Sequence, residues 1–172
     1  DVQSNVSATS YNNLKDDEAR EVLKAPDILQ NLINDGRLGQ KTKAGFYKKT
    51  DEGILSVDLK SGEYKTQKKV LFDGYRAAKV YQKVEDRIKS LAFNDDKAGK
   101  FFWEITADSL IYSANRVPEI SDDIINIDNA MKWGYGWELG PFECWDALGV
   151  RKSVKRMKEE NKNVPIWVDQ ML

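Results

Sequence analysis

The spacing of apolar residues constrains the fold of this chain more than any other feature of the sequence. Apolar residues recur by threes and fours before Gly45 and again after Lys69, as on one face of an α-helix. Only the stretch from Gly45 to Thr66 departs from this spacing, with short runs of aromatic and branched residues broken by Asp51-Glu52-Gly53 and Ser61-Gly62. The sequence therefore predicts a mainly α fold with a small antiparallel β meander near residues 45–66.

Capping residues and prolines predict where the helices begin and end. After Lys69 we expect one long amphipathic helix, carrying Ala77, Tyr81, Val84, Ile88 and Leu91. The next helix, from about Lys97 to Val117, has apolar residues on more than one face, so we expect it to be central and surrounded. The other expected helices cover 16–23, 26–36, 121–134, 141–149, 150–160 and 165–172.

Composition excludes several classes of function. The 172 residues contain no histidine and one cysteine, Cys144, so catalytic triads, histidine metal sites, a structural zinc site and an internal disulfide are excluded. The 27 basic and 28 acidic side chains predict no nucleic-acid partner. No apolar stretch is long enough for a membrane helix, and residues 1–13 lack the zones of a signal peptide. We expect a cytoplasmic protein with no membrane partner.

Two stretches are more particular than generic helix and turn. The first, GRLGQKTKAGFYKK (36–49), resembles the signature that closes a C-terminal repeat of 3-hydroxyacyl-CoA dehydrogenases. The second, IDNAMKWGYGWELGPFECWDALGV (127–150), resembles the Gly-Pro-Phe signature within such a repeat. The first match rests on Gly39, Lys41, Gly45, Phe46 and Tyr47, and the second on Ile127, Asp128, Ala130, Met131, Gly134, Gly140, Pro141, Phe142, Asp146 and Gly149.

The resemblance implies the C-terminal helical region of such a dehydrogenase, a multi-helix domain of the 6-phosphogluconate dehydrogenase C-terminal-like type. Because the two signatures stand in reverse order for a single repeat, residues 1–50 are expected to be the tail of a first repeat. Residues 51–172 would then hold the β meander and a second repeat, packed with the first part as one globular unit. In this family such a second repeat would serve as a built-in partner for the first, as in dimers of single-repeat members.

The same resemblance assigns catalysis to other parts of the parent enzyme, which transfers hydride between NAD and an acyl-CoA in fatty acid β-oxidation. This chain has neither a histidine nor a Gly-x-Gly-x-x-Gly motif after a strand. We therefore expect no catalytic, cofactor-binding or metal residues here, and an isolated chain that is inactive. The expected partners are the Rossmann domain and first repeat, the acyl-CoA substrate, a fused enoyl-CoA hydratase domain, and a second copy of the chain through self-association.

Several residues allow a second interpretation. The lysines and glycines of the first signature favour a structural turn over a CoA phosphate site, since a P-loop context is missing. In this turn Phe46 and Tyr47 are expected to anchor the first strand against helices, while Lys41 and Lys43 remain in water. The aromatic residues Trp133, Trp137, Phe142 and Trp145 favour a core over an acyl-binding groove. We interpret Cys144 as a small buried hydrophobe.

Polar residues near helix ends also carry two interpretations. Asn115-Arg116 echoes a family pair found near the reacting carbonyl in the first repeat, but here it favours a helix-end pair. The acids Glu104, Glu119, Asp122 and Asp123 favour helix-dipole partners over an acid/base set. An acyl-CoA-binding or protein-interaction helical module remains the alternative function.

Overall fold

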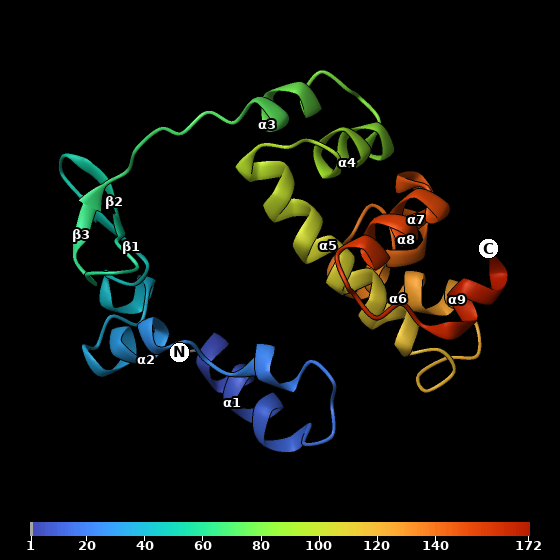
Figure 1. Ribbon diagram of the computed structural model, residues 1–172. Coiled ribbons are helices and arrows are strands. Elements are labelled where there is room, and N and C mark those ends of the chain that lie inside the picture. Colours follow the sequence, from blue (N-terminus) through green and yellow to red (C-terminus); the bar gives the residue numbers. More distant parts are fainter. Residues whose placement is uncertain (1) are drawn as a thin grey trace. The chain divides into compact units, whose positions relative to one another are not determined.

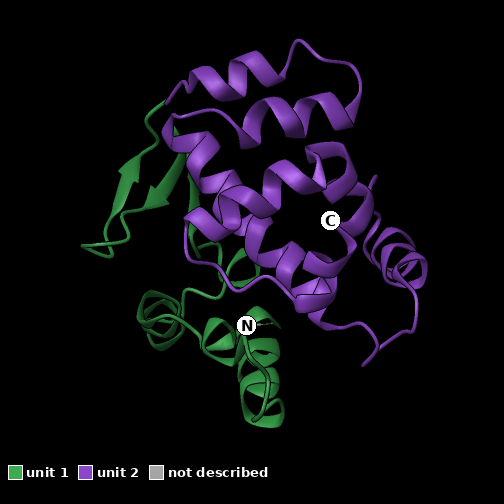
Figure 2. Cartoon of the chain, turned by 45° about the vertical axis from the view of Figure 1, so that its right-hand side comes forward, with its two compact units in different colours: residues 1–69 green, residues 70–172 purple. Residues whose placement is uncertain are grey.

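The structure of the protein is a computed structural model that describes residues 2–172, and Figure 1 shows it as a ribbon. The chain divides into two compact units, residues 1–69 and 70–172, coloured separately in Figure 2. The assignment of residues 1–50 and 51–172 to two repeats packed as one unit stays a prediction. Among the described residues, no helix combines the length and apolar character needed to cross a membrane.

The first unit contains helices followed by a three-stranded sheet. Its elements in chain order are α1 (Val2–Asn13), η1 (Arg20–Leu23), α2 (Asp27–Asn34), η2 (Gln40–Thr42), β1 (Tyr47–Thr50), β2 (Gly53–Val57) and β3 (Tyr64–Thr66). The strands form an antiparallel sheet in the order β1-β2-β3, with Tyr47 opposite Ser56 and Val57 opposite Tyr64. The predicted meander is confirmed, and so is the helix after Pro26, which buries Leu32 and precedes Gly36.

Residues before Pro26 differ from the expectation. The α-helix expected over 16–23 is wrong, because only the 3₁₀ turn η1 forms there. The Asp17 carboxylate accepts a hydrogen bond from the Ala19 amide at 2.8 Å and so turns the chain locally. Helix α1 was not expected, and since none of its side chains is buried, apolar spacing carries no trace of it.

The second unit is all helical. Its elements are α3 (Asp73–Ala78), α4 (Val84–Ala92), α5 (Lys97–Asn115), α6 (Ile124–Tyr135), α7 (Pro141–Leu148), α8 (Val150–Glu159) and α9 (Ile166–Met171). The short helix α7 lies at its centre, in contact with α4, α5, α6 and α8. The core consists of Ala92, Trp103, Ala107, Leu110, Ala114, Ile127, Phe142, Trp145, Leu148, Val154, Met157 and Val168.

The single long helix expected after Lys69 is wrong, because α3 and α4 are separate helices joined by residues 79–83. Lys83 is extended, with ψ 136°. The Arg87 guanidinium donates hydrogen bonds to the carbonyls of Tyr81 and Gln82, which replace the partners that a continuous helix would supply. The apolar spacing continues across the break although Val80 is 76% exposed, so the pattern alone does not reveal it.

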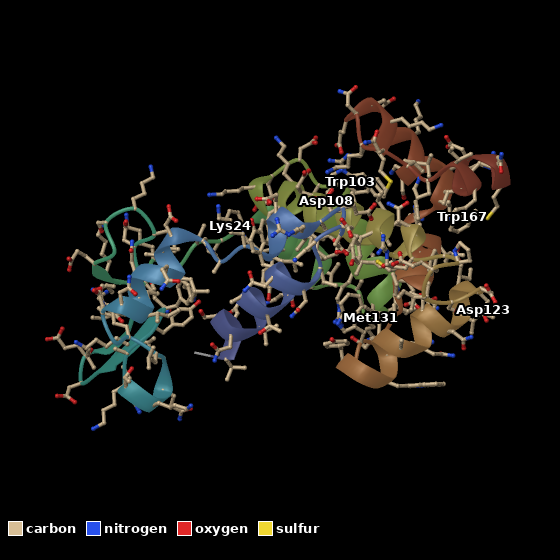
Figure 3. The ribbon with its side chains drawn as sticks, turned by 90° about the horizontal axis from the view of Figure 1, so that it is seen from below. Lys24, Trp103, Asp108, Asp123, Met131 and Trp167 are labelled. Carbon is tan, nitrogen blue, oxygen red and sulfur yellow. The ribbon has the colours of Figure 1, made fainter. Side chains whose placement is uncertain are left out.

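The helix from Lys97 to Asn115 is confirmed, but it is not surrounded. One face of α5 buries Trp103, Ala107 and Leu110, whereas Phe101 on another face is 66% exposed. Hydrogen bonds fix the ends of the buried face in the unit. The Trp103 indole donates to Glu160 at 2.6 Å and the Trp167 indole donates to the Ala114 carbonyl at 3.1 Å; Figure 3 labels both tryptophans. The other predicted helices of this unit agree with α6, α7, α8 and α9 to within a few residues.

Candidate functional site

The second signature is organised around Asp128, which lies on the inner face of α6 and is only 5% exposed. Its two carboxylate oxygens accept hydrogen bonds from the backbone amides of Phe142, at 2.7 Å, and Glu143, at 3.1 Å. These amides belong to the first turn of α7, which has no partners of its own for them. Asp128 therefore caps α7 from a neighbouring helix, and a negative charge suits that end of the helix dipole.

Gly140 allows this contact because its backbone lies against Asp128. A Cβ atom placed on Gly140 would fall 2.3 Å from the Asp128 Cβ and 2.4 Å from its Cα, which is shorter than real contacts allow. Pro141 follows as the first residue of α7 and is buried, and its ring fixes the φ angle that a helix start needs. The Gly-Pro-Phe sequence thus joins α6 to α7 at close range.

Two residues outside the expected set complete this junction. Glu143 accepts a hydrogen bond from the Gly140 amide at 2.8 Å and pairs with Lys132 of α6 at 2.5 Å. Glutamate at the third position of a helix is a known capping residue, so the sequence held a signal for it. The Lys132 ammonium, with the Gly140 amide, lowers the pKa of Glu143. Burial raises the pKa of Asp128 and outweighs its two amide hydrogen bonds, which act in the opposite direction.

The aromatic residues of this signature divide into two groups. Phe142 and Trp145 are buried in the core, as expected, and the Phe142 ring lies 6.2 Å from that of Trp167. The expectation that Trp133 and Trp137 are core residues is wrong, because they are 81% and 45% exposed. Their backbone lies at the end of α6 and in the turn to α7, beyond the face that packs inward.

The remaining residues of the signature are a glycine between two helices, an exposed acid and an unreactive cysteine. Gly149 separates α7 from α8 with φ 90°, a conformation that other residues rarely adopt. Asp146 is exposed on α7. Cys144 is half-buried beside the core, and burial, with the nearby Asp128, raises the pKa of its thiol to about 11. A thiol that stays protonated at neutral pH is a poor nucleophile, in agreement with its interpretation as a small hydrophobe.

The first signature forms a tight turn in the other unit. Gly39 has φ 98°, and a Cβ atom on Gly45 would lie 2.8 Å from the Gly39 Cα, so the two glycines pack backbone against backbone. The Gly39 amide donates to the Ala44 carbonyl at 2.7 Å, and Thr42 accepts a hydrogen bond from the Leu38 amide. The family glycines therefore close the turn that precedes β1.

The aromatic pair of the first signature does not anchor the sheet against helices, contrary to the expectation. Phe46 is 37% exposed and Tyr47 is 64% exposed, and both line an apolar groove at β1. Lys41 and Lys43 are exposed, as expected. The tight contact of this turn lies at Gly45, where any side chain would meet the Gly39 backbone.

The residues with two interpretations occupy helix-end or ion-pair positions. Asp123 caps α6 by accepting a hydrogen bond from the Asn126 amide at 2.8 Å; Figure 3 shows Asp123 at the beginning of this helix and Met131 farther along it. Arg116, next to Asn115, pairs with Glu119 at 2.8 Å. Glu104 and Asp108 both pair with Lys162 at 2.8 Å. Asp123 therefore lies at a helix start as expected, whereas Glu104 and Glu119 form ion pairs instead.

The described residues offer no site suited to a metal ion or to NAD. Residues 2–172 contain no cluster of three or more histidine, cysteine or carboxylate side chains suited to a metal ion. NAD-binding domains place the pyrophosphate between a parallel strand and a helix, and the strands described here are antiparallel. Residues 47–66 therefore do not fit NAD, and the absence of any cofactor from this chain stays a prediction.

Comparison with known proteins gives matches over the whole chain. A "Probable 3-hydroxyacyl-CoA dehydrogenase" of Bacillus subtilis is 38% identical over all 172 residues, which make up 22% of its length. A "Putative fatty acid oxidation complex trifunctional enzyme" of Rickettsia felis is 34% identical over 119 residues, 67% of this chain and 15% of that protein. The Rickettsia prowazekii protein of the same name is 30% identical over 147 residues, 83% of this chain and 19% of that protein. No protein-family model and no solved structure matches.

The chain belongs to the 3-hydroxyacyl-CoA dehydrogenase family. Over its whole length the chain is homologous to part of the 3-hydroxyacyl-CoA dehydrogenases, which confirms the family resemblance of its two signatures. The chain spans about a fifth of the length of these relatives. Its classification as a 6-phosphogluconate dehydrogenase C-terminal-like domain stays a prediction.

Proposed function

We propose that this chain is a C-terminal helical part of an NAD-dependent 3-hydroxyacyl-CoA dehydrogenase of fatty acid β-oxidation, in which its second repeat takes the place of a partner subunit. The NAD-binding Rossmann domain and the catalytic residues lie elsewhere in the parent enzyme. The proposal includes a cytoplasmic location and a fused enoyl-CoA hydratase domain. The isolated chain is then a structural segment without turnover.

The observation that carries the partner role is an aromatic turn at the end of α6, formed by Trp133, Tyr135 and Trp137. Their exposed fractions are 81%, 76% and 45%. Each such side chain can bury on the order of 150–250 Å² in an interface. Exposed apolar surface of this size, concentrated in five residues, is typical of a protein contact surface. Gly134 and Gly136 within the turn add no side chains that would cover it.

Enzyme activity tests the first half of the proposal. We expect no NADH formation when the purified 172-residue chain is mixed with NAD and a 3-hydroxyacyl-CoA, because no imidazole is present to take the hydroxyl proton. Turnover that copurifies with the chain through several columns would refute this half.

Analytical ultracentrifugation tests the second half of the proposal, the role of the chain as a partner surface. The chain is expected to self-associate with increasing concentration, and Trp133→Gln is expected to shift it toward monomer. Val80→Gln is the matched control, since Val80 is 76% exposed but lies outside the aromatic turn. A chain that stays monomeric at all concentrations, or equal effects of the two substitutions, would contradict a contact surface at this turn.

The alternative, an acyl-CoA-binding module, is favoured by one observation, the apolar groove at β1 in the first unit. It does not exclude the structural role, because the groove and the aromatic turn involve different residues.

A further inference from the structure

The outer face of the β1–β2 hairpin carries exposed apolar side chains where a small sheet is normally polar. Tyr47 and Lys49 point to the same face, and Ile54 lies directly opposite Lys49. Tyr47 is 64% exposed and Ile54 is 56% exposed, whereas Val57, on the other face, is buried. Antiparallel sheets with one covered face usually place polar residues on the open one. The aromatic and branched residues here need a reason other than folding.

These residues line a groove of about 780 Å³, together with Lys43, Phe46 and Asp51. Sites for small organic ligands usually have volumes of about 300–1,000 Å³ and mainly apolar walls with a few polar groups. The groove runs along β1 next to the turn closed by Gly39 and Gly45, so its wall rests on backbone that is held by hydrogen bonds. It is a preformed apolar surface.

The charge around the groove is strongly one-sided. Residues 36–50 include five basic side chains and no acidic one. Lys43 and Lys49 line the groove and form no ion pair among the described residues, while Asp51 is the single acid that lines it. An apolar surface with unpaired cations at its edge complements a ligand with an apolar chain and an anionic head.

We infer that this groove is an accessory site for a fatty acyl-CoA, with the acyl chain on Phe46, Tyr47 and Ile54 and the CoA phosphates at Lys43 and Lys49. The ligand class rests on the proposed function, because it is taken from the relatives that are 3-hydroxyacyl-CoA dehydrogenases by name. Peptide addition to β1 is disfavoured, since Ala44 already bridges Lys48 on the free edge of this strand.

Isothermal titration calorimetry of the 172-residue chain with octanoyl-CoA tests this site. Octanoyl-CoA is expected to bind more tightly than either CoA or octanoate alone, because each of these lacks one half of the contacts. Raising the salt concentration is expected to weaken binding, as for any contact between lysines and phosphates at a surface. No heat with octanoyl-CoA, or equal binding of CoA alone, would overturn the inference.

Matched variants locate the site. Lys49→Gln is expected to weaken octanoyl-CoA binding up to about fivefold, the range of an exposed ion pair. Lys48→Gln, on the opposite face of the same strand, is expected to leave it unchanged. Ile54→Thr is expected to weaken binding, whereas Ile125→Thr, at a 66% exposed position on α6, is not. All four substituted residues are exposed, so the fold is expected to persist, and the circular dichroism spectrum of each variant checks this.

Two further results would contradict an acyl-CoA site. One is equal weakening by the Lys48 and Lys49 variants, which would indicate non-specific charge attraction. The other is a dimer that Ile54→Thr dissociates, since a second copy would then cover the groove. These outcomes are distinguishable from failure of the proposed function, which depends on NADH formation and on the Trp133 variant.

Discussion

Replacing Asp128 by asparagine perturbs the contact that joins the beginning of α7 to α6. Asparagine keeps one oxygen, which can still accept the 2.7 Å hydrogen bond from the Phe142 amide. The second oxygen becomes an amide nitrogen, a donor that faces the Glu143 amide, also a donor. The negative charge at this helix N-terminus is lost as well.

The size of the effect follows from these contacts. A hydrogen-bonding group left unsatisfied in the interior costs about 1–3 kcal/mol, and the half-buried position of Glu143 places it at the low end. Loss of the charge at a helix N-terminus adds about 0.3–1 kcal/mol. Relief of the burial of a charge acts in the opposite direction. We expect Asp128→Asn to lower the free energy of unfolding of the second unit by about 1–2 kcal/mol.

Urea unfolding at pH 7, followed by tryptophan fluorescence, measures this change. All five tryptophans lie between residues 103 and 167, so the signal reports the second unit alone. For a urea dependence of about 2 kcal/mol per M, the midpoint is expected to fall by roughly 0.5–1 M. Asp123→Asn is the control, because Asp123 caps α6 at the surface and asparagine is an equally good cap there. Equal midpoints for the two variants would refute a special role of Asp128.

Four further outcomes are expected. Gly140→Ala should destabilise the second unit by about 1–3 kcal/mol in urea unfolding, because the added Cβ would collide with Asp128. Gly134→Ala should not, because a Cβ at Gly134 meets no other atom within 4 Å. Equal effects of the two substitutions would argue against the close approach of Gly140 to Asp128. The raised pKa of Asp128 in the folded protein gives stability that is present at acid pH and lost as the pH rises through that pKa. The difference in unfolding free energy between wild type and Asp128→Asn should therefore widen on acidification. A difference that stays constant with pH would contradict this. The lowered pKa of Glu143 gives stability that is lost as the pH falls through that pKa. Glu143→Gln should therefore reduce the stability that the second unit loses on acidification. Cys144 should react with iodoacetamide at pH 8 far more slowly than free cysteine, and a similar rate would contradict its raised pKa.

Much of the fold could be predicted because its signals are local. Pro141 and Gly149 mark the ends of α7, and Asp123 marks the beginning of α6, through the conformations and caps that these residues favour. The meander between Gly45 and Thr66 was predicted from its turns and its change of spacing. Each of these signals acts on residues close by in the sequence, so tertiary contacts have little influence on it.

The errors arose where apolar spacing does not record what decides the structure. The long helix expected after Lys69 is interrupted before Val84, where the Arg87 side chain binds the carbonyls of Tyr81 and Gln82, and no pattern of apolar spacing records such a bond. Trp133 was placed in a core on hydrophobicity alone, which cannot distinguish a core residue from a contact residue.

The candidate site shows the same division. The motif residues Asp128 and Gly140 were identified as a structural set from the sequence, but their contact across two helices was not, because it depends on how α6 and α7 cross. Glu143 was missed although its position in the first turn of α7 is a recognised capping position. The groove at β1 could not be found from sequence, since it depends on which face of the hairpin is covered.

The central position of α7 has a consequence for how the second unit forms. Helix α7 has only eight residues, too few to persist alone in water, and its partners include α4 and α5, which lie earlier in the sequence. Its hydrogen-bonded amides are thus protected from solvent only once distant elements have assembled. The Phe142 and Glu143 amides should accordingly exchange hydrogen for deuterium only when the whole unit opens, which makes them reporters of its global folding equilibrium.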